Sequence, residues 1–242
     1  LIAGAHVFTI EGSIATAGRV VAAVAPRLGW FDLSTLKEPY RLEGKKTIGL
    51  ELAEQLGWRM PDVLLYPTGG GTGLVGIPKA YEELRGMGWI SGALPRVYAV
   101  QAEGCAPVVK AFAEGAENTT AWENPTTHAA GLRVPSPFAG RQMLRVLRDT
   151  RGGAVAVGED AIRDAQRRVA RVEGIWTAPE SAALVAALTV LRDRGEVARD
   201  AEVVLVFTGI GFKYAPPPLA APIDLSGTDE EILAQVRRAV GA

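Results

Sequence analysis

Several residue types that support particular chemistries are scarce in this chain. One cysteine, Cys105, excludes an intrachain disulfide, and two histidines beside it are too few for a common zinc site. The 26 basic side chains nearly balance the 27 acidic ones, so no strong overall field attracts nucleic acid or an anionic membrane. The sequence has no run of 18 apolar residues and predicts no membrane-spanning helix. With no cysteine pair to oxidise, we expect a cytoplasmic protein.

What is abundant is apolar: 48% of the 242 residues are hydrophobic, enough to build a sizeable core. Short runs without polar alternation predict buried parallel strands at Val63–Tyr66, Val97–Val100 and Val203–Phe207, with a weaker one at Val155–Val157. Segments with helical spacing alternate with these strands. They lie around Ile48–Leu56, Leu74–Leu84, Ile162–Val172, Glu180–Leu191 and Ile232–Val240. This alternation predicts an α/β fold, a mainly parallel sheet with helices on both faces.

The first residues are typical of the middle of a domain. The chain starts at Leu1 rather than Met, lacks the charged start of a signal peptide, and has a short strand pattern at His6–Ile10. We therefore expect the sequence to begin inside a larger protein. The pattern changes near Lys37–Tyr40, which predicts a boundary: residues 1–39 as the remnant of a smaller α/β domain, and residues 40–242 as a larger one.

The sharpest motif is the segment Thr68–Gly73, here called the glycine loop. It follows a predicted strand and precedes a predicted helix, and four of the five residues 69–73 are glycine. Backbone N–H groups in such a turn, together with a helix N-terminus, bind anions and above all phosphate. The hydroxyls of Thr68 and Thr72 are further candidate donors. A tight turn without a ligand is the alternative, although it requires fewer glycines.

A dinucleotide site is a second alternative. Gly71, Gly73 and Gly76 match the G-x-G-x-x-G pattern, and Glu103 follows the next predicted strand, where an acid would bind a ribose. Against it, Glu103 lies 27 residues after Gly76, beyond the usual spacing of about 20. Gly69 and Gly70 are also more than this fingerprint needs.

Six segments together resemble the threonine synthases, which are pyridoxal-phosphate enzymes of fold type II. They occur in family order along nearly the whole chain: Tyr40–Thr47, Pro67–Leu74, Gln101–Pro107, Ala130–Pro135, Gly174–Ala183 and Thr208–Lys213. The glycine loop fits the wider superfamily, whereas Glu43–Thr47 and Gln101–Pro107 are more specific. The resemblance implies the large cofactor-binding domain of that fold for residues 40–242.

The resemblance also implies roles for individual residues. Pyridoxal 5'-phosphate would be held through its phosphate by Gly69, Gly70, Gly71, Thr72 and Gly73, and Thr208 would place its hydroxyl at the pyridine nitrogen. A hydroxyl there supports replacement and elimination chemistry. The implied reaction converts O-phosphohomoserine and water to threonine and phosphate, and the family often forms homodimers. No metal is implied.

No residue in this sequence matches the family's Schiff-base lysine, which we expect upstream of residue 1. The chain has six lysines, of which Lys45 and Lys46 are interpreted as structural or solvated and Lys213 as near the cofactor at most. The sequence therefore predicts a fragment of a threonine synthase, inactive alone. Another lyase of the same fold, such as a threonine or serine ammonia-lyase, and a non-catalytic domain for phosphate-bearing ligands remain alternatives.

Overall fold

A four-stranded parallel sheet forms the centre of the computed structural model, which describes residues 1–12, 14–215 and 222–240. The strands are β1 (Val63–Pro67), β2 (Arg96–Ala102), β3 (Gly153–Val157) and β4 (Val203–Leu205), in the order β3-β2-β1-β4. Leu64 of β1 pairs with Val97 of β2 and with Val204 of β4. The predicted fold class is confirmed.

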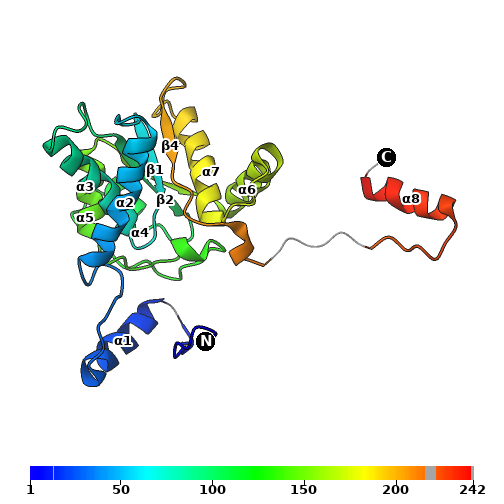
Figure 1. Ribbon diagram of the computed structural model, residues 1–242, viewed down its shortest axis with the longest axis horizontal. Helices are drawn as coiled ribbons and strands as arrows, with labels where there is room; N and C mark the ends of the chain where they lie inside the picture. The colour runs from blue at the N-terminus through cyan, green and yellow to red at the C-terminus, as the bar shows by residue number, and fades with distance from the viewer. Residues whose placement is uncertain (13, 216–221, 241–242) are drawn as a thin grey trace.

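Helices cover both faces of the sheet (Figure 1). On one face α6 (Glu159–Glu173) and α7 (Pro179–Asp193) pack against alternate strand residues such as Val63 and Leu65. The other face, which carries Leu64 and Tyr66, is covered by the remaining core helices: α2 (Tyr40–Gln55), α3 (Thr72–Gly86), α4 (Pro107–Ala113) and α5 (Gly140–Asp149). Burial on both faces explains why the strands lack polar alternation.

The structure corrects two boundaries. His6–Ile10, expected to form a strand, has no regular structure and is exposed. The last strand ends at Leu205 rather than Phe207, although the Val206 N–H still donates to Leu65 O at 3.2 Å. Helix α3 continues through Pro78, which has no N–H to donate within the helix.

Helices α2 and α3 approach closely, because glycines lie at their contact. A Cβ on Gly49 would stand 2.8 Å from the Ala80 Cβ and 2.9 Å from the Ile77 carbonyl oxygen. Four charged side chains also join the two helices: the ammonium of Lys46 lies 2.6 Å from both Glu43 and Glu83, and Lys79 pairs with the same two acids. The structural interpretation of Lys46 is thereby confirmed.

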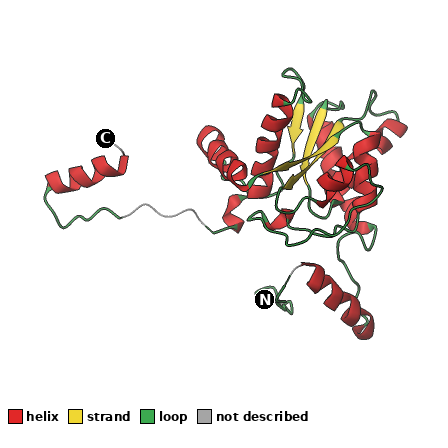
Figure 2. Cartoon of the chain, turned by 180° about the vertical axis from the view of Figure 1, so that it is seen from behind, coloured by secondary structure: helices red, strands yellow, loops and turns green. Residues whose placement is uncertain are grey.

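Two helices project from the body formed by the sheet and its covering helices (Figure 1, Figure 2). They are α1 (Ile14–Leu28), before the predicted boundary, and α8 (Asp229–Val240). Thr228 and Glu231 form a capping box at the start of α8: the Thr228 N–H donates to the Glu231 carboxylate at 2.7 Å, and the Glu231 N–H donates to Thr228 Oγ1 at 3.3 Å. None of the helices in the described ranges combines the length and apolar character that membrane crossing requires.

Candidate cofactor site

The glycine loop connects β1 to α3 at the carboxyl end of the sheet, where parallel α/β proteins bind ligands. Gly71 is the residue before the helix and has a φ of 86°, a left-handed conformation that favours glycine. A Cβ on Gly69 would collide with the carbonyl oxygen of Gly131, and one on Gly71 would collide with the Met143 side chain. The loop backbone is therefore packed too closely for side chains at these positions.

The start of α3 offers backbone donors. No side chain in the described ranges caps this helix, and its first internal bond runs from the Val75 N–H to Gly71 O. The N–H groups of Thr72, Gly73 and Leu74 therefore remain available to an anion, favoured also by the helix dipole. Within the loop, Gly70 and Thr72 are half-buried and the other residues are buried.

Thr68 does not have the function we considered for it. Its side chain is fully buried, and its hydroxyl donates to the carbonyl oxygen of Tyr66 at 2.8 Å. Its own carbonyl accepts a hydrogen bond from the Gln101 amide at 3.1 Å. Thr68 thus fixes the path of the loop, and Thr72 is the threonine left to face a ligand.

Thr208 lies at the same end of the sheet, three residues past β4. It is exposed and lines a cavity of about 420 Å³ together with Pro67, the last residue of β1, and Gly131. Its backbone N–H donates to Ser181 Oγ at 3.0 Å. The structure thus brings Thr208 beside the strand that leads into the glycine loop.

Gly131 connects the cavities around the loop. It belongs to the short 3₁₀ turn Ala130–Leu132, here called the Gly131 turn. It lines the cavity with Thr208, a cavity of about 540 Å³ with Gly70, and a third of about 510 Å³. Three adjoining cavities therefore meet at Gly131, and together, here called the opening, they extend from Gly70 to Thr208 at the carboxyl end of the sheet.

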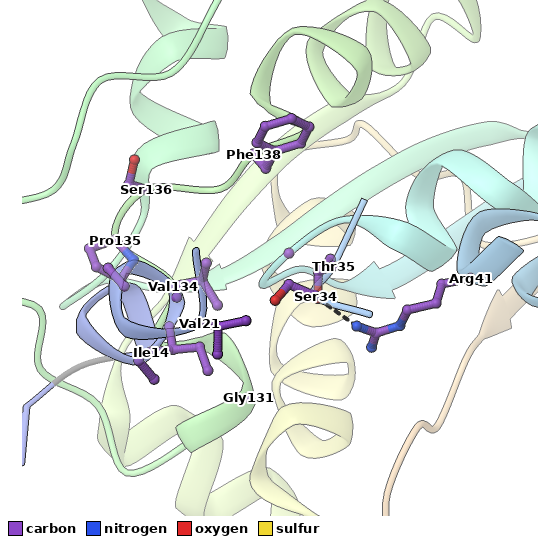
Figure 3. Close-up of a pocket in the computed structure, with 14 residues that line it drawn as sticks. Ile14, Val21, Ser34, Thr35, Arg41, Gly131, Val134, Pro135, Ser136 and Phe138 are labelled. Carbon is purple, nitrogen blue, oxygen red and sulfur yellow. Dashed lines mark hydrogen bonds between the residues drawn. The ribbon is translucent and has the colours of Figure 1, made fainter. Parts of the chain in front are cut away.

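Sequence analysis missed Arg41 as a site residue. It is the one charged side chain among the described residues that line the 540 Å³ cavity, whose far wall is part of α1. Figure 3 shows it pointing toward Ser34 and Thr35, and its Nη1 donates to Thr35 Oγ1 at 3.3 Å and to Leu33 O at 2.8 Å. The signal was present, because Arg41 lies within the Tyr40–Thr47 motif.

Comparison with known proteins identifies the family. The model of the family described as "Pyridoxal-phosphate dependent enzyme" matches residues 2–209. This chain belongs to that family. The cofactor predicted from the sequence, pyridoxal phosphate, is confirmed, and the dinucleotide alternative no longer explains the glycines. Gly76 instead allows α2 to approach α3, since a Cβ there would lie 3.2 Å from Leu42 O.

The similar proteins include two archaeal threonine synthases. The chain is 39% identical over 209 residues to the threonine synthase of Methanosarcina acetivorans, covering 86% of this chain and 51% of that protein. It is 34% identical over 210 residues to that of Methanocaldococcus jannaschii, with 87% and 51% covered. The chain thus spans about half the length of these relatives.

Solved structures of the same fold carry other names. A threonine deaminase from T.th. superposes with a TM-score of 0.64 at 25% identity, covering 82% of this chain and 66% of that one. Maize serine racemase superposes with a TM-score of 0.68 at 22% identity, with 97% and 64% covered. The fold is therefore shared among enzymes with different reactions.

The residues present fit the cofactor. Uncapped N–H groups at the start of α3 suit a phosphate, and the glycines of the loop add no side chain beside them. A Cβ at Gly70 would stand 3.0 Å from Thr35 Cγ2, so glycine also leaves room for the neighbouring Thr35. The exposed Thr208 adds a hydroxyl group to the lining at the other end of the opening. Of the sequence-predicted residues, Gly70 and Thr208 line the opening, and Gly69, Gly71, Thr72 and Gly73 lie next to Gly70 in the same loop.

Proposed function

We propose that this chain forms the cofactor-binding part of a threonine synthase, which converts O-phosphohomoserine and water to threonine and phosphate. The observation that carries the proposal is the opening shared by Gly70, Gly131 and Thr208 in a chain most similar, among the relatives named above, to threonine synthases. Pyridoxal phosphate, when bound, supplies an electron sink for charge developing on the substrate.

The protein's residues then have separate tasks. The N–H groups of Gly69–Gly73 and the Thr72 hydroxyl bind the cofactor phosphate. The Thr208 hydroxyl bonds to the ring nitrogen without transferring a full charge to it, which limits the electron sink and favours elimination and replacement.

Arg41 supports a substrate that itself carries a phosphate. Two of its hydrogen bonds hold it against residues 33–35, and its remaining guanidinium N–H groups are free to bind an oxyanion in the 540 Å³ cavity. A guanidinium in this place suits the substrate phosphate of a synthase. It equally suits a carboxylate, which threonine and serine also carry, so the choice of the synthase over an ammonia-lyase rests on the similarity to threonine synthases.

We also propose that this chain alone does not turn over substrate. Among the described lining residues of the three cavities, the one lysine is Lys213. Lys37, Lys46 and Lys79 are paired with acids. Borohydride reduction with the cofactor, followed by peptide mapping, is expected to show no stoichiometrically labelled lysine; labelling of Lys213 together with phosphate release would overturn this.

A chimera tests the activity itself. This chain replaces the matched region of the Methanosarcina acetivorans threonine synthase, and the product is assayed with O-phosphohomoserine. We expect the chimera to release phosphate and threonine in equal amounts. In the chimera with Arg41→Gln, we expect a raised KM for O-phosphohomoserine with little change in kcat. A folded, cofactor-loaded chimera that instead releases ammonia from threonine or serine would contradict the proposal.

A further inference from the structure

Two consecutive residues in the first turn of α7 contact opposite walls of the opening. Ser181 is fully buried, and its Oγ accepts the backbone N–H of Thr208 at 3.0 Å. Glu180 reaches the other wall, where its Oε1 accepts the backbone N–H of Gly131 at 2.6 Å. The same oxygen accepts a hydrogen bond from the Tyr214 hydroxyl. One helix end thus holds the Gly131 turn and the segment Thr208–Tyr214, which are distant in sequence.

The Glu180 contact extends to the glycine loop. Gly131 packs so tightly that a Cβ on it would lie 2.8 Å from Glu180 Oε1, and its carbonyl oxygen fills the space a Cβ on Gly69 would need. Gly131 is therefore fixed between the carboxylate on one side and the loop on the other. A displaced Glu180 would release the Gly131 turn from Gly69.

Helix α7 is a rigid support for these contacts. Pro179 stands in its first turn, and Ala182, Ala183 and Leu184, directly after the pair, are fully buried in the core. Side chains on a packed helix hold a site more accurately than side chains on loops.

We propose that Glu180 and Ser181 are the positioning residues of the cofactor site, Glu180 for the wall beside the glycine loop and Ser181 for Thr208. The inference rests on the proposed cofactor site. Each residue acts at a different end of the cofactor: Glu180 on the phosphate environment, and Ser181 on the ring nitrogen. If either residue had only a structural role, its substitution would not selectively change the phosphate environment or the ring nitrogen.

Tyr214 supports the positioning role of Glu180. Burial raises the pKa of the Tyr214 phenol, and the hydrogen bond and charge of Glu180 raise it further. The Tyr214 hydroxyl therefore stays protonated, and remains a hydrogen-bond donor, to higher pH than an ordinary phenol.

The test uses 4'-deoxypyridoxine 5'-phosphate, a cofactor analogue without the aldehyde, so that no lysine reacts. For Glu180→Ala we expect about tenfold weaker binding and a phosphorus NMR resonance closer to that of free analogue, with an unchanged ring absorption. Glu180→Gln, which keeps an acceptor oxygen, is expected to restore binding to within about twofold. Tyr214→Phe, which removes one of the two donors, is expected to fall between them and serves if the Ala variant does not fold.

For Ser181→Ala we expect the reverse pattern. The phosphorus resonance stays at its original position, and the ring-nitrogen titration followed by absorption moves toward that of free analogue, because Thr208 is no longer fixed. Ser181→Cys, similar in size with a weak acceptor, gives the same result if the Ala variant is unstable. Asp193→Ala, an exposed acid at the other end of α7, is the control and leaves both signals unchanged.

The outcomes separate the two proposals. An unaltered chain that does not bind the analogue overturns the proposed cofactor site and the positioning roles with it. Normal binding by the unaltered chain, with folded Glu180 and Ser181 variants that leave both signals unchanged or move both equally, overturns the positioning roles alone.

Discussion

Glycine is needed at Gly69, Gly71 and Gly131 for different physical reasons. Gly71 has a positive φ and adjoins Met143, whereas Gly69 is confined by the Gly131 carbonyl oxygen and Gly131 by the Glu180 side chain. Substitution at any of them would disturb folding as well as ligand binding. Gly70 differs, because its φ is ordinary and the nearest neighbour of an added Cβ would be Thr35 Cγ2 at 3.0 Å.

Gly70→Val is therefore the sharpest single-residue test of the glycine loop. The branched side chain would occupy the space beside Thr35 that the cofactor phosphate approaches. We expect a folded protein whose affinity for pyridoxal phosphate is at least about tenfold weaker, measured by equilibrium dialysis. Gly86→Val, at the exposed end of α3 with nothing within 4 Å of its Cβ, should bind normally. Equal affinity of both variants would show that the glycine loop is not part of the cofactor site.

At the scale of elements, the contact of α2 with α3 depends on Gly49. Gly49→Ala forces a methyl group against Ala80 and the Ile77 carbonyl, and we expect the free energy of unfolding to fall by about 1–3 kcal/mol. Gly44→Ala in the same helix meets nothing within 4 Å and should raise it by roughly 0.5–1 kcal/mol. Urea unfolding of the three proteins measures both; a neutral Gly49→Ala would show that the helices separate easily.

The start of α6 is joined to the loop before the Gly131 turn by Glu159. Burial raises the pKa of Glu159, but hydrogen bonds from Thr127 and His128 lower it by more, so the folded protein favours the carboxylate. This stabilisation is complete above the ordinary pKa of 4.5 and is lost as the pH falls through the lowered value.

We therefore expect Glu159→Gln to be less stable than the unaltered chain at pH 7, with the difference shrinking as the pH is lowered below about 4.5. Urea unfolding at several pH values provides the measurement. Glu173→Gln, at the exposed C-terminal end of the same helix, is the matched control. If the stability difference between Glu159→Gln and the unaltered chain instead grew toward acid pH, the inferred lowering of the Glu159 pKa would be wrong.

At the scale of the whole molecule, α8 lies apart from the sheet and its covering helices (Figure 2), and none of its described residues lines the three cavities of the opening. A chain that ends at Ala215 keeps Tyr214 and every residue placed in the site. We expect it to bind pyridoxal phosphate with unchanged affinity and to unfold at the same urea concentration as the unaltered chain. Weaker binding after this truncation would place part of the site in the removed segment.

The sequence predicted those parts of the molecule that depend on neighbouring residues. The buried strands, the glycine loop and the α8 capping box each have a local signal, as does Thr208 through the motif around it. Glu180 and the Gly131 turn also lie in motif segments, but their contact had no local signal, because it joins residues 49 apart in sequence. The prediction of a strand at His6–Ile10 was wrong for the opposite reason. Its strand pattern is local, but no neighbouring strand in the described structure pairs with it.

The pairing of β1 with β4 has a consequence for the order of events during synthesis. Val63 pairs with Val203, and the Asp62 carboxylate accepts the Glu202 N–H across a separation of 140 residues. At about 5–20 residues per second, a ribosome needs roughly 7–28 seconds to make that intervening chain. Throughout this interval the glycine loop exists without Thr208, and one edge of β1 is unpaired. The cofactor opening is therefore a late product of translation, and the nascent chain passes through a period in which chaperones or other strands can reach β1 first.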